Sequence, residues 1–221
     1  MVYILHIDTS ADTSSVMVCA DGKPVCTETN STLRDHATAI NNMISAALAS
    51  AGIAMAQLAA IAVCSGPGSY TGLRIAMATA KGICYAMDIP LLLQDRLSLL
   101  ALAAIQQHPT AGYIASILVA RDKEYFISIH DNKFDTILAP VHMMEEDMAE
   151  MLQNRENLHI TTNAAEELFF KLKVKFCSFG QNIILDNGAW AEYAYEQYDR
   201  NGNVNIANAI PLYLKSVYTH K

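Results

Sequence analysis

A glycine-rich run, SGPGSYTGLR, has the residue types and spacing most suggestive of chemistry, and it lies between a short apolar stretch and an alanine-rich one. Glycine permits backbone conformations and close approaches that a Cβ would block. A glycine-rich turn from a strand into a helix also directs backbone N–H groups forward, which suits an anion. The same turn can instead seat a helix against a sheet, and the spacing leaves both interpretations open. The candidate residues are Gly66, Pro67, Gly68, Ser69, Tyr70, Thr71, Gly72 and Arg74.

Two well-known motifs are similar to this run without matching it. The glycines follow the pattern GxGxxxG, whereas a dinucleotide-binding turn has GxGxxG and opens a βαβ unit. Ser69 follows a glycine but lacks the GxSxG spacing of a nucleophile elbow. We therefore assign Ser69 no nucleophilic role and expect Ser69→Ala to leave folding and activity nearly intact.

The elements that would position this run occur twice in the same order. Each half is expected to have three strands in a meander, then a helix, a strand and a helix, with Asp21-Gly22 as a hairpin turn. Apolar periodicity and turn residues predict strands at 2–8, 14–20, 24–30, 60–64, 91–94, 113–120, 124–130, 133–138, 158–161 and 175–178, and helices at 33–51, 73–87, 98–107, 145–153, 164–171 and around Trp190. This order predicts an α/β protein with the actin-like, ribonuclease-H-like duplicated fold and two similar mixed-sheet halves. The expected halves are residues 1–108 and 109–221, with the C-terminal segment packing back on the first.

Asp8 ends the first predicted strand, where actin-like ATPases approach a nucleotide-bound cation. A carboxylate at a strand end can hold Mg²⁺ through water. The second half has no equivalent, because residues 120–123, ARDK, lack the Asp-x-Gly of a phosphate-binding hairpin, and residues 179–181, FGQ, are a short remnant of an adenosine-binding glycine cluster. Asp8 is therefore either part of a vestigial nucleotide site or a turn and capping residue. We expect no cofactor on the chain alone, and ATP or ADP only with a partner subunit.

Two helical stripes are candidates for a protein interface. The first predicted helix offers the apolar stripe Ile40, Met43, Ile44 and Ala47. On the second, small residues recur every fourth position at Gly72, Ala76, Ala80 and Cys84, which would let another helix approach closely. Packing of these stripes on the protein's own sheet is the alternative. The candidate partner interface comprises His36, Ile40, Met43, Ile44, Ala47, Ala76, Thr79 and Ala80.

Composition limits the classes of function. The formal net charge of −7 argues against stand-alone binding to nucleic acid or anionic membranes, which needs a basic surface. The five cysteines are scattered, as expected of reduced thiols in a cytoplasmic protein. The apolar stretch 46–64 is interrupted by Ser50, Gly52 and Gln57, so no membrane span is predicted.

Several segments together resemble one family. The run SGPGSYTGLRIAMATAKGICYA looks like the hallmark segment of the TsaB (YeaZ) family, and HIDTSADTSSV resembles that family's first strand and turn. Leu33-Arg34-Asp35-His36 resembles the start of its first helix, and PLYLK at 211–215 resembles its C-terminal ending, with Lys215 where arginine is usual. The similarity covers nearly all of the first half and the last few residues.

The resemblance implies a cytoplasmic, non-catalytic dimerization subunit of the tRNA N6-threonylcarbamoyladenosine transferase complex. Implied partners are the catalytic paralog TsaD, a TsaE-like ATPase and a second copy of the chain, with tRNA contacted only indirectly. The catalytic paralog holds metal partly through two histidines one helical turn apart, but here Ile40 stands four residues after His36. His142 and Glu145 lack a nearby third ligand, so no metal site is predicted.

Two alternatives are enzymes that act alone. The first is a small actin-like sugar or carboxylate kinase or ATPase, which would need an intact second phosphate loop. The second is a peptidase, for which the sequence has neither a nucleophile nor a metal-ligand set.

Overall fold

The chain forms two compact units in the computed structural model, which describes residues 1–32, 36–153, 155–164, 168, 172, 177–180 and 185–215. The first unit comprises Met1–Asp95 with Asn187–Leu212, and the second comprises Arg96–Asp186 with Tyr213–Lys221. Helix α3, Arg96–Gln107, groups with the second unit because it packs against strands of that unit's sheet. The expectation that 1–108 and 109–221 are the two structural halves stays a prediction.

The first unit is built on a five-stranded mixed sheet with the order β3-β2-β1-β4-β5. Strands β1, β2 and β3 form the predicted antiparallel meander, and β4 and β5 run parallel to β1. Asp21 and Gly22 both have positive φ, as expected for the predicted β2–β3 turn. The strand bounds are Tyr3–Asp8, Ser14–Ala20, Lys23–Asn30, Leu58–Cys64 and Leu91–Gln94.

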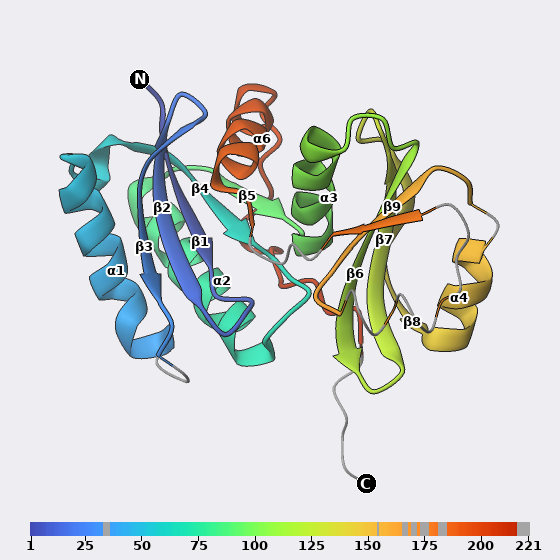
Figure 1. The fold of residues 1–221 in the computed structure, drawn as a ribbon. Helices are drawn as coiled ribbons and strands as arrows, with labels where there is room; N and C mark the ends of the chain where they lie inside the picture. The colour runs from blue at the N-terminus through green and yellow to red at the C-terminus, as the bar shows by residue number, and fades with distance from the viewer. Residues whose placement is uncertain are drawn as a thin grey trace, which may run out of the picture. The chain divides into compact units, whose positions relative to one another are not determined.

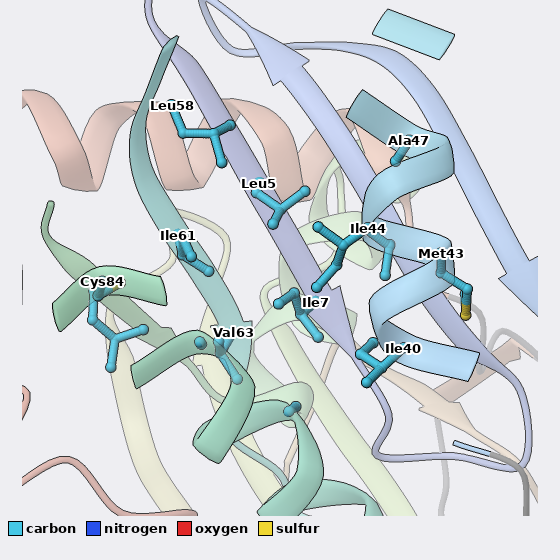
Figure 2. Close-up of a cluster of buried hydrophobic side chains, with 14 of the residues drawn as sticks. Leu5, Ile7, Ile40, Met43, Ile44, Ala47, Leu58, Ile61, Val63 and Cys84 are labelled. Atoms are coloured by element: carbon cyan, nitrogen blue, oxygen red, sulfur yellow. The ribbon is translucent and has the colours of Figure 1, made fainter. Parts of the chain in front are cut away.

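Alternation along β1 divides the side chains between the two faces of this sheet. Leu5 and Ile7 pack with helices α1, His36–Ala51, and α2, Tyr70–Met87, in a large aliphatic core (Figures 1 and 2). Ile4 packs on the other face, in a smaller cluster with Ala194 of helix α6, Asn187–Asp199. The short 3₁₀ helix η1, Met55–Gln57, precedes β4.

Helix α6 comes from far along the chain, yet it packs against β1, β3 and β5 of the first unit. Its docking centres on Gln94, whose side-chain amide accepts a hydrogen bond from Trp190 Nε1 and donates one to Gln197 Oε1 at 3.0 Å. Both partners of the Gln94 side-chain amide lie on α6, so this buried amide fixes the helix over the end of β5.

The second unit repeats the first topology, with the order β10-β9-β6-β7-β8. Ile114 packs with Ala101 of α3, while the next residue, Ala115, packs with Met148 of helix α4, Glu145–Gln153. The two helices therefore cover opposite faces of the sheet (Figure 1). The repeated sheet confirms the predicted duplicated α/β fold. The strands are Tyr113–Arg121, Glu124–Asp131, Thr136–Met144, Leu158–Thr162 and Cys177–Gly180.

Strand β8 differs from its predicted bounds of 133–138. Asp131 Oδ1 accepts the backbone N–H groups of Lys133 and Asp135, and this turn delays the start of the strand. The strand then continues through Pro140 to Met144, which is possible because β8 is an edge strand. Most of the predicted helix 164–171 and the residues after Lys215 lie outside the described residues. Within the described ranges, no helix is long and apolar enough to cross a membrane.

An ionic cluster ties the C-terminal segment to the second sheet. Glu124 Oε2 accepts a hydrogen bond from Lys215 Nζ and lies 2.8 Å from His142 Nε2. The Lys215 ammonium, and then His142, lower the pKa of the Glu124 carboxyl. All three side chains are largely covered, so solvent screens this cluster less than a surface pair.

Glu124→Gln should therefore lower the melting temperature at neutral pH. A carboxyl whose pKa is lowered by folding contributes stability above its unfolded pKa, and that contribution is lost as the pH falls through the folded pKa. The deficit of the variant should shrink on acidification, as measured by thermal unfolding over a pH series. Glu196→Gln, which removes an exposed i,i+4 partner of Arg200, is the control and should change little. A Glu124→Gln deficit that is the same at every pH would contradict this account.

Candidate functional site

The glycine-rich loop joins β4 to α2 and packs directly against the turn that follows β1. Ser69 N–H donates to Ser10 O at 2.8 Å, and the Thr9 hydroxyl donates to Gly72 O at 2.6 Å. The Gly66–Pro67 peptide bond within the loop is cis. On the far side of the loop, Leu212 N–H donates to Ser65 O at 2.8 Å. The loop therefore lies between two other segments of the first unit and is bonded to both.

Two glycines are required by this packing. A Cβ on Gly72 would lie 1.8 Å from Thr9 O, and a Cβ on Gly68 would lie 2.1 Å from Ser10 O. Neither distance is possible for real atoms, and backbone carbonyls cannot move aside as a flexible side chain can. The positive φ in the loop belongs to Gly66, at 114°. This geometry favours the interpretation in which the loop seats a helix against the sheet.

Ser69 is the N-cap of α2. Its hydroxyl accepts the Gly72 N–H at 3.2 Å, and its carbonyl accepts the Leu73 N–H at 2.8 Å. The cap explains why the helix begins at Tyr70, three residues before the predicted start. It also revises the expectation for Ser69→Ala, because loss of an N-cap hydroxyl costs about 1 kcal/mol of stability.

The remaining loop residues belong to the exposed start of α2. Tyr70, Thr71 and Arg74 are exposed, and the Arg74 guanidinium lies 4.5 Å from the centre of the Tyr70 ring. A cation over an aromatic face at this distance is an attractive contact. It holds the Arg74 side chain along the outer surface of the helix.

Asp8 is 6% exposed and sits at the end of β1. Its Oδ1 accepts the Ser10 N–H at 2.8 Å, which is the bond of an Asx turn. This geometry fits the turn and capping interpretation of Asp8. A vestigial nucleotide site stays a prediction.

The predicted partner stripe lies in the core of the first unit. Figure 2 shows Ile40 and Ile44 of α1 directed toward Leu5 and Ile7 of β1, and Met43 and Ala47 belong to the same core. Ile44 is 2% exposed, and Ala76 and Ala80 of α2 are also buried in this core. The apolar face of each helix covers the sheet, so these side chains are core residues of their own unit, and a partner contact through them stays a prediction. Thr79 is half-buried, and the His36 side chain lies outside the described set.

The opposite faces of the same two helices are exposed and made mainly of small residues. Helix α2 presents Ala78, Gly82 and Tyr85, and Tyr85 is 84% exposed. A Cβ on Gly82 would meet no atom within 4 Å, so the fold of this chain does not require glycine there. Helix α1 presents Asn41, Ser45 and Ala49 on its outer side. We call these residues, with Arg74, the outer α1–α2 face. Sequence reasoning missed it, although a glycine in the middle of a helix was the available signal.

In the second unit, the residues considered as nucleotide or metal ligands lie on separate elements. Residues 120–123 form the β6–β7 hairpin, with Lys123 at φ 57°, and Phe179 and Gly180 end strand β10. His142 is engaged with Glu124, and the Glu145 carboxylate accepts from Tyr125 at 3.0 Å. In the part of the chain that the structure describes, no three His, Cys, Asp or Glu side chains are grouped to hold a metal ion.

The two repeated sheets and their flanking helices define an actin-like protein. A solved structure, YeaZ from Pseudomonas aeruginosa, covers 97% of this chain and is itself covered completely, with a TM-score of 0.77 at 22% identity. The activator of the 2-hydroxyisocaproyl-CoA dehydratase from Clostridium difficile is more distant, with a TM-score of 0.52 at 10% identity over 90% of this chain and 97% of that one. At these identities the likeness shows the fold.

The sequence comparisons show the family. Residues 29–198 match the family model of TsaD, the tRNA N6-adenosine threonylcarbamoyltransferase, so the chain belongs to that family. The TsaB protein of Haemophilus influenzae is 27% identical over 99% of this chain and 95% of its own length. The TsaB protein of Bacillus subtilis is 28% identical over 69% of this chain and 67% of its own length. The resemblance to TsaB (YeaZ) is thus confirmed.

Gly72→Ala and Gly82→Ala make a matched pair on one helix. At position 72 the added methyl group meets a backbone carbonyl, so we expect a loss of stability on the order of 3 kcal/mol. At position 82 the methyl group enters open space and removes backbone freedom from the unfolded chain, so a gain of about 0.5–1 kcal/mol is expected. Urea unfolding followed by circular dichroism measures both. Equal effects of the two changes would show that the contact with Thr9 does not hold the loop.

Proposed function

We propose that this chain is a non-catalytic subunit of the tRNA threonylcarbamoyladenosine machinery and that it binds a TsaD-type catalytic partner through the outer α1–α2 face. The observation that carries the proposal is the pairing of Gly82, which the fold does not require, with the exposed Tyr85 on one helix surface. Relatives named TsaB support the assignment to tRNA threonylcarbamoyladenosine biosynthesis, and the match to the TsaD family model supports a TsaD-type partner.

The contacts of the loop residues support a structural role for the glycine-rich loop and not a catalytic one. The Ser69 hydroxyl accepts a helix N–H, and the Asp8 carboxylate accepts a turn N–H. Gly68 and Gly72 hold the start of α2 against the β1–β2 turn. Each of these residues fixes where α2 lies, and α2 carries half of the outer face. The loop therefore acts through the helix that it positions.

The outer face has the features of a helix-packing surface. Ala78 and Gly82 lie four residues apart on α2, which lets the backbone of a partner helix come close. Tyr85 can supply an aromatic anchor at such a contact, and Arg74 a charged edge. A surface made of two neighbouring helices can also pair with its own copy about a two-fold axis. We therefore propose a homodimer that competes with the heterodimer for the same face.

The remaining roles follow from the proposed complex. The net charge of −7 opposes direct contact with tRNA, so tRNA would be bound by other subunits. A TsaE-like ATPase is the proposed third subunit. Any bound ATP or ADP would require a partner, and the complex would act in the cytoplasm.

Ala78→Arg tests the proposed face. The new charge should abolish binding of the TsaD-type partner and reduce dimerization, because a charge is costly to bury without an opposite partner. The isolated fold should survive, because position 78 is exposed. Binding is measured by pull-down and light scattering, and tRNA modification by nucleoside mass spectrometry in a strain that depends on this chain.

Two further variants make that test specific. Val25→Arg adds the same charge at an exposed position on β3 and should leave binding and modification unchanged. Ile44→Arg puts the charge in the core and should unfold the first unit instead of merely separating subunits. An Ala78→Arg protein that binds its partner and supports modification as well as Val25→Arg would place the interface elsewhere.

The purified chain alone should hydrolyse neither ATP nor peptide. Asp8 and Ser69, the groups best placed for such chemistry, are engaged in a turn and a helix cap. Phosphate release and peptide cleavage assays, with and without added Mg²⁺, measure this directly. ATP turnover that is lost in Asp8→Asn would favour the alternative of a small actin-like kinase or ATPase.

A further inference from the structure

Helix α6 docks on the first sheet over a buried histidine. His6 lies on β1, in the middle of the face that α6 covers, and it is fully buried. Its ring contacts Trp190 of α6 edge-to-face, with centroids 4.9 Å apart and planes at 88°. Trp190 is also hydrogen-bonded to Gln94, so a single side chain of α6 is in contact with both β1 and β5.

The surroundings of His6 suit a neutral imidazole. Its Nδ1 lies 3.3 Å from Ile4 O, and its Nε2 is buried with no hydrogen-bond partner among the described atoms. The cluster on this face is apolar and includes Ala62 and Leu92. Burial lowers the pKa of His6 to about 4, against smaller opposing effects of the Ile4 and Trp190 backbone. A proton on this ring would place a positive charge in an apolar layer.

The charged and titratable groups near this layer come from three elements. Asp8 follows His6 on the same face of β1, and its carboxylate accepts the Ser10 N–H. On α6, Glu192 and Glu196 are exposed, and the half-buried Tyr193 interacts with Asp95 at the end of β5. None of these groups contributes to the lowered pKa of His6.

The two faces of the first sheet differ in how much apolar side chain they bury against their helices. The α1–α2 face buries a continuous set of large aliphatic side chains. On the α6 face, the buried apolar cluster is smaller and consists of Ile4, Ala60, Ala62, Leu92 and Ala194, with the buried Trp190 beside it. Because buried apolar area sets most of the docking energy, α6 is the element that can open while the rest of the unit stays folded.

We propose that the protonation state of His6 controls the docking of α6. When the imidazole is protonated, α6 undocks from the first sheet while the α1–α2 side stays packed. The docked state binds fewer protons than the open state at pH values between about 4 and the ordinary 6.5. Docking is therefore at full strength above pH 6.5 and weakens about tenfold in its equilibrium constant for each pH unit below, until His6 is protonated in both states. Release would also free the segment after α6, which is bonded to β5 through Val204 and to the loop through Leu212.

The chain provides its own probe, because Trp190 is the single tryptophan. Tryptophan emission and far-UV circular dichroism should be followed in one acid titration. We expect the emission maximum to move to longer wavelength at a higher pH than the loss of the circular dichroism signal. In His6→Phe, which keeps a ring against Trp190, the emission change should move down to coincide with global unfolding. His159→Phe is the control: His159 is a buried histidine of the second unit with a similarly lowered pKa, and its loss should leave the early emission change in place.

Two outcomes would overturn the proposal. One is a wild-type titration in which emission and circular dichroism change together at every pH. The other is an early emission change that persists in His6→Phe. If that variant does not fold, the ring resonances of His6 in the wild-type protein decide the matter by NMR. Their titration must coincide with the emission change of Trp190, and a separate midpoint would refute the release.

Discussion

The first unit depends on one close backbone contact, in which Gly68 and Gly72 lie against the carbonyls of Ser10 and Thr9. No side chain fits between these segments, so the start of α2 has a single position relative to the end of β1. Ser69 caps the helix at that point, and Asp8 closes the turn on the other side. The glycine-rich loop between β4 and α2 resembles a phosphate-binding loop in sequence, but its contacts set the orientation of α2.

That orientation decides which surface of the unit is open to a partner. With α2 fixed at its start, Ala76 and Ala80 turn into the core beside Ile44 of α1. The outer α1–α2 face is then presented to solvent, with Gly82 and Tyr85 upon it. A partner that binds there would be sensitive to the loop without touching it.

Much of the fold followed from the sequence, because alternating apolar residues and turn residues act locally. Asp21-Gly22 identified the β2–β3 hairpin, and the repeated order of elements identified the duplicated sheets. The face of each helix could not be assigned in that way. An apolar stripe containing Ile44 fits a core and an interface equally well, and only the sheet beneath it decides. The docking of α6 could not be predicted from the sequence either, because Trp190 and Gln94 lie 96 residues apart along the chain.

The central claim, that the outer α1–α2 face binds the catalytic partner, is tested most directly by photocrosslinking in cells. A photoreactive amino acid would replace Tyr85 on this face, and in a second strain Ile137, an exposed residue of β8. The account predicts a covalent adduct with the TsaD-type protein, identified by mass spectrometry, from position 85 and not from position 137. An adduct with that protein from position 137 alone would contradict it.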